Sequence, residues 1–276
     1  MNSADTMSRL SKAKQAFEEK DIGLARKAHT DSSIKKHLHD EGLNDFGGQY
    51  LGEFVYGAID GTVTTFAVVA GATGATLSPG VVIILGFANL IGDGFSMASG
   101  NFLSERTQRD YIRKERAREE WEIENVREGE VEEIREIYRK KGFRGKDLET
   151  AVKIITSDKK TWVDTMMTEE LGLIESQKKP WMTALVTYTG FILIGLIPLL
   201  AYVLSYFSDF FKNNTFMAAI VMTVIGLISI GIIKRYVTKK NLFKSVFETL
   251  FVGGAAAVMA YFVGYFLQWV VHVSIG

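Results

Sequence analysis

Long apolar runs alternate with highly charged stretches along this chain of 276 residues. Five apolar runs each have about 19 residues or more, enough for a helix to cross a hydrocarbon core of about 30 Å. A soluble protein would need five helices that are apolar on every face, which is rare. The pattern therefore predicts an all-α membrane protein with five transmembrane helices, over residues 54–77, 80–103, 181–207, 215–233 and 246–275.

A charged segment, residues 104–180, separates the second apolar run from the third. Its first part continues from the second run without a proline, and the glycines of KGFRGKD predict a turn before two shorter amphipathic helices. We therefore expect a three-helix insert. The predicted organisation is an N-terminal segment at 1–49, two transmembrane helices at 50–103, the insert at 104–180 and three transmembrane helices at 181–276.

The loops between the apolar runs predict the orientation of the chain. The loop between the last two runs is rich in lysine and arginine, whereas the other two short loops carry little charge. Positive loops favour the cytoplasmic side. This rule places the N-terminus and the insert in the cytosol. The basic residues of the loop are Lys234, Arg235, Lys239, Lys240 and Lys244.

Composition excludes several classes of function. Acidic and basic residues number 32 each, so no basic excess points to nucleic acid, and the absence of cysteine excludes disulfides and thiolate metal ligands. The chain contains no nucleophile or zinc-protease motif and no phosphate-binding loop. We therefore predict no enzyme and no prosthetic group, and any pumping must use an ion gradient. His37 and His39 have no further ligands nearby and are expected at the surface without metal.

Polar residues interrupt the first two apolar runs at helical spacing. Glu53, Asp60 and Thr64 share one helix face, and a second stripe repeats every four residues at Asn89, Asp93, Met97 and Asn101. A charged Asp at the centre of a membrane helix costs about 2.5–3.5 kcal/mol, so such residues mark an ion path or hydrogen-bond a neighbouring helix. Two carboxylates, two amides and a thioether together favour the ion path over a purely structural role.

The insert carries acidic residues on helical faces. Glu119 and Glu122 share one face, Glu130 and Glu133 share another, and Met166, Met167 and Glu170 lie on the last helix. Spacing alone favours a solvated face paired with Arg and Lys, and adjacent methionines are more often core than ligand. If these groups do bind a metal, carboxylates with thioethers suit a borderline divalent ion better than Ca²⁺ or Mg²⁺.

Two sequence motifs resemble those of a known family. AIDGTVTTFAVVAG in the first run and GDGFSMASGNFLSER at the end of the second are similar to signatures of the vacuolar iron transporter (VIT) family. The order of two spans, an acidic insert and three spans is also similar, over about residues 50–275. Asn101 departs from a common Glu of the family, and Gln49 stands where a further acidic residue is common.

The resemblance implies a homodimer with an ion path between the first spans of the two subunits, through which Fe²⁺ leaves the cytosol in exchange for protons. It implies that Asp60 and Met97 line the path, with Glu53 nearer the cytosol. The metal-binding groups that it implies for the insert are Glu119, Glu122, Glu130, Glu133, Met166, Met167 and Glu170.

The sequence thus leads to one preferred function and one alternative. The preferred function is a proton-coupled exporter of Fe²⁺, with Mn²⁺ as a further substrate, in a vacuolar membrane or a prokaryotic plasma membrane. The expected partners are the lipid bilayer, divalent metal ions, protons and a second copy of the chain. The alternative is a membrane-anchored metal sensor or scaffold without transport, which would not need Asp60, Met97 and Glu53 to be aligned.

Overall fold

The computed structural model describes residues 15–28, 46–238 and 241–271, and all regular structure within them is helical. The chain forms two compact units, Met1–Gln49 and Tyr50–Gly276. The first unit contains α2 (Ile22–Ala28). His37, His39, Lys239 and Lys240 lie outside the described residues.

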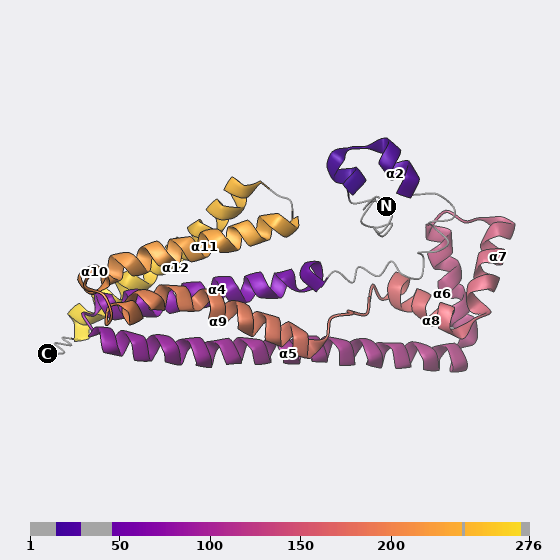
Figure 1. Cartoon of the computed structure of the whole chain (residues 1–276). Coiled ribbons are helices and arrows are strands. Elements are labelled where there is room, and N and C mark those ends of the chain that lie inside the picture. Colours follow the sequence, from indigo (N-terminus) through magenta and orange to yellow (C-terminus); the bar gives the residue numbers. More distant parts are fainter. Residues whose placement is uncertain (1–14, 29–45, 239–240, 272–276) are drawn as a thin grey trace. The chain divides into compact units, whose positions relative to one another are not determined.

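Five long helices dominate the second unit (Figure 1). Each contains a run that is long and apolar enough to cross a bilayer, which confirms the predicted all-helical membrane protein with five candidate spans. Pro79 and Pro180 stand in the first turn of their helices, where the missing proline N–H breaks no hydrogen bond. The five helices are α4 (Phe46–Gly74), α5 (Pro79–Asn125), α9 (Pro180–Leu204), α11 (Thr215–Thr238) and α12 (Leu242–Val271).

Helix α9 lies at the centre of the bundle, in contact with α5 and α11, and α12 packs on α11. Its side chains Phe191 and Leu199 are fully buried in the main apolar core. The short helix α10 (Asp209–Asn213) joins α9 to α11.

Glycines let α4 and α9 approach each other closely. A Cβ atom added at Gly61 would lie 2.9 Å from the Cα of Phe191, and one at Gly57 would lie 3.1 Å from the backbone N of Phe191. Gly190 and Gly195 of α9 meet the backbone of α4 in the same way. Small residues at such a crossing allow backbones to pack without intervening side chains. The crossing holds the glycine face of α4 against α9.

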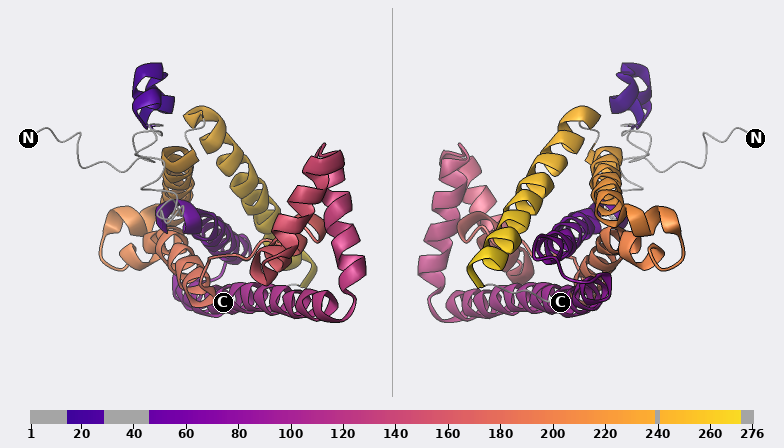
Figure 2. Two further views of the ribbon diagram at one scale, coloured as in Figure 1. Left: turned by 90° about the vertical axis from the view of Figure 1, so that its right-hand side faces the viewer. Right: turned by 90° about the vertical axis from the view of Figure 1, so that its left-hand side faces the viewer.

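The charged segment after the second span extends α5 and then folds back (Figure 2). Helix α5 continues without a break to Asn125, and the chain turns at Val126, whose φ and ψ are −128° and 37°. The insert then forms α6 (Arg127–Lys140), α7 (Gly145–Thr156), α8 (Lys159–Thr165) and the π-helical turn η2 (Met166–Glu170).

The turn at Val126 divides the region that we expected to form the first helix of a three-helix insert. An uninterrupted helix would carry Ile134 away from Ile112 and Ile123, whereas the turn brings all three into one buried cluster with Trp162 and Met166. Burial of a large apolar side chain contributes about 1.5–3 kcal/mol, which favours the turn over a continuous helix. The insert therefore has its own small apolar core.

We predict that Gly61→Ala destabilises the protein, because the added methyl group collides with the backbone of α9. Overpacking of this kind costs about 1–3 kcal/mol. Gly52→Ala is the matched control in the same helix, since a Cβ there would meet nothing within 4 Å. Thermal unfolding of the purified chain in detergent should show a lower midpoint for Gly61→Ala only. Equal midpoints for the two variants would contradict the close packing.

Candidate functional site

A polar seam runs between the membrane helices α4 and α5. The Thr64 hydroxyl donates to the backbone oxygen of Asp60 at 2.8 Å and accepts a hydrogen bond from the amide of Asn89 at 3.4 Å. The carboxylates of Asp60 and Asp93 are close enough for their charges to interact. The structure thus brings together Asp60, Thr64, Asn89 and Asp93, which the sequence had placed on two separate helices.

Met97 and Asn101 continue the stripe of α5 beyond Asp93. Met97 is partly buried and packs against the main apolar core. Asn101 donates to the hydroxyl of Thr187 on α9 at 2.8 Å. The amide of Asn101 therefore links α5 to α9, a contact that its helical spacing did not predict.

One side of the seam is open in the single chain. Asp93 is exposed, and Cβ atoms added at Gly92 or Gly100 would meet nothing within 4 Å. An ionised carboxylate facing lipid is costly. This face of α5 therefore needs a polar or protein covering in the membrane.

Glu53 lies about two turns before Asp60 on α4 and forms an ion pair across the fold. Its Oε1 atom is 2.6 Å from Nζ of Lys178, a residue of the segment that joins η2 to α9. Its Oε2 atom is buried without a hydrogen-bond partner. The side chain of Glu53 is only 15% exposed, so its charge is largely removed from water.

The predicted acidic residues of the insert lie within electrostatic range of one another. Glu119 interacts with Glu122, Glu133 and Glu170, and Glu130 interacts with the same groups. Glu119 is 1% exposed, and neither of its carboxylate oxygens receives a hydrogen bond. Five carboxylates from α5, α6 and η2 therefore form one acidic cluster: Glu119, Glu122, Glu130, Glu133 and Glu170.

Arg118 borders this acidic cluster. Its guanidinium group lies 2.8 Å from Glu119, 2.6 Å from Glu122 and 2.9 Å from Glu115. Arg118 thus compensates part of the negative charge at the edge of the cluster. Among the described residues, no three carboxylate or imidazole side chains converge closely enough to hold a single ion.

Burial and the repulsion between like charges raise the pKa values of carboxyl groups in the acidic cluster. Burial, followed by the charge of Glu133, raises the pKa of Glu130 to about 7. Burial and then the charge of Glu133 also raise the pKa of Glu170. At neutral pH Glu130 is therefore partly protonated.

The methionines of the insert are placed differently from Glu170. Met166 and Met167 are both buried in the apolar core of the insert, beside Trp162. Glu170, at the end of the same π-helical turn, reaches the acidic cluster. The structure thus brings Glu170 to the other carboxylates, while the role of the two sulfur atoms as ligands stays a prediction.

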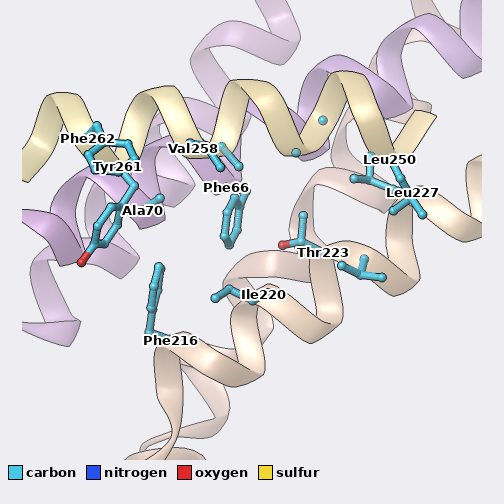
Figure 3. A pocket seen from close by; sticks show the side chains of 14 residues that line it. Phe66, Ala70, Phe216, Ile220, Thr223, Leu227, Leu250, Val258, Tyr261 and Phe262 are labelled. Atoms are coloured by element: carbon cyan, nitrogen blue, oxygen red, sulfur yellow. The ribbon is translucent and has the colours of Figure 1, made fainter. Parts of the chain in front are cut away.

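A cavity of about 340 Å³ lies between α4, α11 and α12 (Figure 3). Its lining is aliphatic and aromatic, with Phe66, Phe216 and Tyr261 around it and Thr223 as a polar member. No charged side chain lines it. The cavity therefore offers no ligand set for a metal ion, and the candidate site is the seam together with the acidic cluster.

Several residues of the site had no signal in the sequence. Lys178 is 125 positions from Glu53, and Thr187 is 86 positions from Asn101. Helical periodicity relates residues that are a few positions apart, so it cannot pair residues on distant segments. Arg118 was detectable in principle, because it stands three and four positions from Glu115 and Glu122.

Comparisons with known proteins agree on one family. The profile of the VIT family matches residues 51–265. A protein named vacuolar iron transporter from Toxoplasma gondii is 35% identical over 274 residues, covering 96% of this chain and 91% of the relative. A protein of the same name from Plasmodium falciparum is 31% identical, covering 93% and 95%. Vacuolar iron transporter 1 from Arabidopsis thaliana is 30% identical, covering 78% and 84%.

We predict that the metal-free protein becomes less stable as the pH rises from about 5 to 8. Glu130 binds a proton up to about pH 7 when folded and up to about 4.5 when unfolded, so the native state holds more protons in this window. Glu130→Gln should remove part of this pH dependence and raise the unfolding midpoint at pH 8. Tryptophan fluorescence during heating, with a chelator present, measures the effect.

Glu128→Gln is the matched control, because Glu128 is exposed and lies two positions away on the same helix. It removes the same charge outside the acidic cluster. A pH dependence that Glu128→Gln and Glu130→Gln reduce equally would contradict the role of burial.

Proposed function

Because the chain belongs to the VIT family, we propose that it carries Fe²⁺, with Mn²⁺ as a further substrate, out of the cytosol in exchange for protons. The names of its relatives, vacuolar iron transporters from parasites and plants, support iron as the cargo. The five apolar helices make the chain an integral membrane protein. The membrane is that of a vacuole or a prokaryotic plasma membrane.

The observation that carries the proposal is the polar seam between α4 and α5. Asp60 and Asp93 are two interacting carboxylates in membrane-spanning helices, and Met97 follows one turn after Asp93. Carboxylate, amide and thioether groups together suit a borderline divalent ion such as Fe²⁺. In this proposal Asp60, Asp93, Asn89 and Met97 line the ion path, and Glu53 receives the ion at its cytosolic mouth.

We propose that the working form is a homodimer in which the two seams face each other. The exposed Asp93 and the open surface at Gly92 and Gly100 support this, because a second copy would cover a carboxylate that lipid cannot solvate. Two copies of Asp60 and Asp93 would then surround one path. Small residues at 92, 96 and 100 would allow the helices to approach closely.

The acidic cluster of the insert has a separate role in the proposal, which is to capture metal in the cytosol. Glu119 is buried, neither of its oxygens receives a hydrogen bond, and only Oε1 has the ion pair with Arg118, so a bound cation would add compensation for its charge. In this proposal Glu122, Glu130, Glu133 and Glu170 move closer together around the bound metal, because no three carboxylates of the described residues converge on one point without it. Met166 and Met167 serve as soft ligands in this proposal. The basic residues at 234, 235 and 244 support the cytosolic orientation of the insert.

Exchange for protons follows from the cost of charge in the membrane. A dication neutralises the two carboxylates while it occupies the seam. After its release, two bare charges would remain in a medium of low dielectric constant. Protons that replace the metal avoid that state and allow the empty transporter to return.

We expect Asp60→Asn to abolish metal uptake by proteoliposomes, because it removes a charge from the path and keeps the shape of the side chain. Asp209→Asn is the matched control, since Asp209 lies on the short helix α10 outside the five spans. Uptake of Fe²⁺ under reducing conditions, with equal amounts of folded protein, is the measurement.

The same assay separates a transporter from a sensor. A sensor would bind metal through the insert and show no uptake with the unmodified chain. Uptake by Asp60→Asn at the wild-type rate would show that the path lies elsewhere.

A further prediction concerns the direction of proton movement. Metal uptake into vesicles should accelerate when the lumen is acidic, and uptake should make the lumen more alkaline. Acid on the cytosolic side should inhibit, because protons then compete with metal for Glu53 and the acidic cluster. A pH-sensitive dye in the lumen measures this exchange, and metal uptake through tight vesicles without a pH change would refute proton exchange.

A further inference from the structure

Lys178 belongs to a segment that connects the insert directly to the mouth of the seam. Residues 171–179 join η2 to α9 and have no regular secondary structure. Within them, Nζ of Lys178 pairs with Oε1 of Glu53 on α4 at 2.6 Å. Lys178 is 32% exposed and Glu53 15%, so the pair is partly removed from water.

The backbone at Lys178 and Lys179 is also attached to the membrane helices. The N–H of Lys179 donates to the hydroxyl of Tyr50 on α4 at 2.8 Å, and Tyr50 is itself buried. Arg109 on α5 donates to the backbone oxygen of Lys178. Three contacts thus hold the end of this segment at Lys178 and Lys179, and one of them is the ion pair between the side chains of Lys178 and Glu53.

The Lys178–Glu53 pair places a single positive charge on a carboxylate whose second oxygen has no partner. Oε2 of Glu53 is buried and accepts no hydrogen bond. A divalent ion would offer twice the charge and could use both oxygens, whereas Nζ of Lys178 uses one. At partly buried positions this difference is weakly screened by water.

We propose that Lys178 is an internal competitor of the transported cation, which occupies Glu53 and is displaced when a dication arrives at the mouth. This rests on the proposed role of Glu53 as the entry carboxylate. Displacement breaks one of the three contacts that hold Lys178 and Lys179, so the arrival of metal at the mouth loosens the end of the segment that leads from the insert. The ammonium group of Lys178 thereby sets the metal concentration at which a dication occupies Glu53.

Transport kinetics test the competition. Lys178→Met keeps the length of the side chain and removes its charge, so it should lower the KM for metal about fivefold, the effect of losing one competing ion pair. Lys178→Arg should stay near the wild type. Lys179→Met is the matched control, because it removes the same charge one position away while Lys179 makes its contact with Tyr50 through the backbone.

Equal KM values for Lys178→Met and Lys179→Met would overturn the proposal, since a general loss of positive charge would then explain the result. An increase in KM for Lys178→Met would also overturn it, because Lys178 would then assist metal entry.

A second measurement does not require transport. The chain has no cysteine, so Ser176→Cys provides a single thiol at a half-buried position of the segment, two residues before Lys178. Without metal, maleimide should label this thiol several-fold faster when Lys178→Met is added than when Lys179→Met is added. Adding Mn²⁺ should accelerate labelling in the Lys178 background and have little effect with Lys178→Met.

The two measurements separate this proposal from the transport proposal. If vesicle uptake occurs but labelling is the same in all variants, the competitor role of Lys178 is wrong and transport stands. If labelling changes as expected but no variant takes up metal, Lys178 does respond to metal and the transport proposal is wrong.

Discussion

A charge that is removed from water has to be compensated, and this constraint accounts for the arrangement of the polar groups in the protein. Within the spans, Asp60 and Asp93 meet at one seam together with Asn89 and Thr64. At the end of α4, Glu53 is held by Lys178. In the insert, Glu119 lies beside Arg118. At Glu53 and Glu119 a basic side chain supplies the compensation, whereas at the seam two carboxylates lie within electrostatic range of each other.

The seam depends on how α4 is packed. Gly57 and Gly61 fix one face of α4 against α9, and Asp60 and Thr64 then lie on a neighbouring face, toward α5. A larger residue at Gly61 would push the helices apart and change the position of the carboxylates relative to α5. The close glycine crossing is therefore a condition for the geometry of the seam as well as for stability.

The sequence predicted the five apolar helices and both polar stripes, because hydrophobic length and helical periodicity are properties of short stretches. It did not predict the turn at Val126, since no proline or glycine stands at that position and burial of Ile134 decides the turn. It also could not predict the pairing of Glu53 with Lys178 or of Asn101 with Thr187, which depends on how distant segments pack.

The methionines of the insert illustrate a related limit. Sequence alone did not decide whether Met166 and Met167 belong to the apolar core or bind a metal. The structure buries both side chains among apolar neighbours. Glu170 follows in the same π-helical turn and joins the acidic cluster. A local pattern can therefore place residues on one helix without showing which of them face the same surroundings.

The unbroken helix α5 has a mechanical consequence. Its 47 residues extend for about 70 Å, of which the apolar part is about half. One end borders the seam and the other carries the acidic cluster, with no proline or irregular turn between Gly80 and Asn125 to absorb bending. A tilt of about 5° within the bilayer would displace the distal end by about 6 Å if the helix stays straight. A small tilt of α5 at the seam would therefore move the insert by several ångströms if the helix moves as one rigid body.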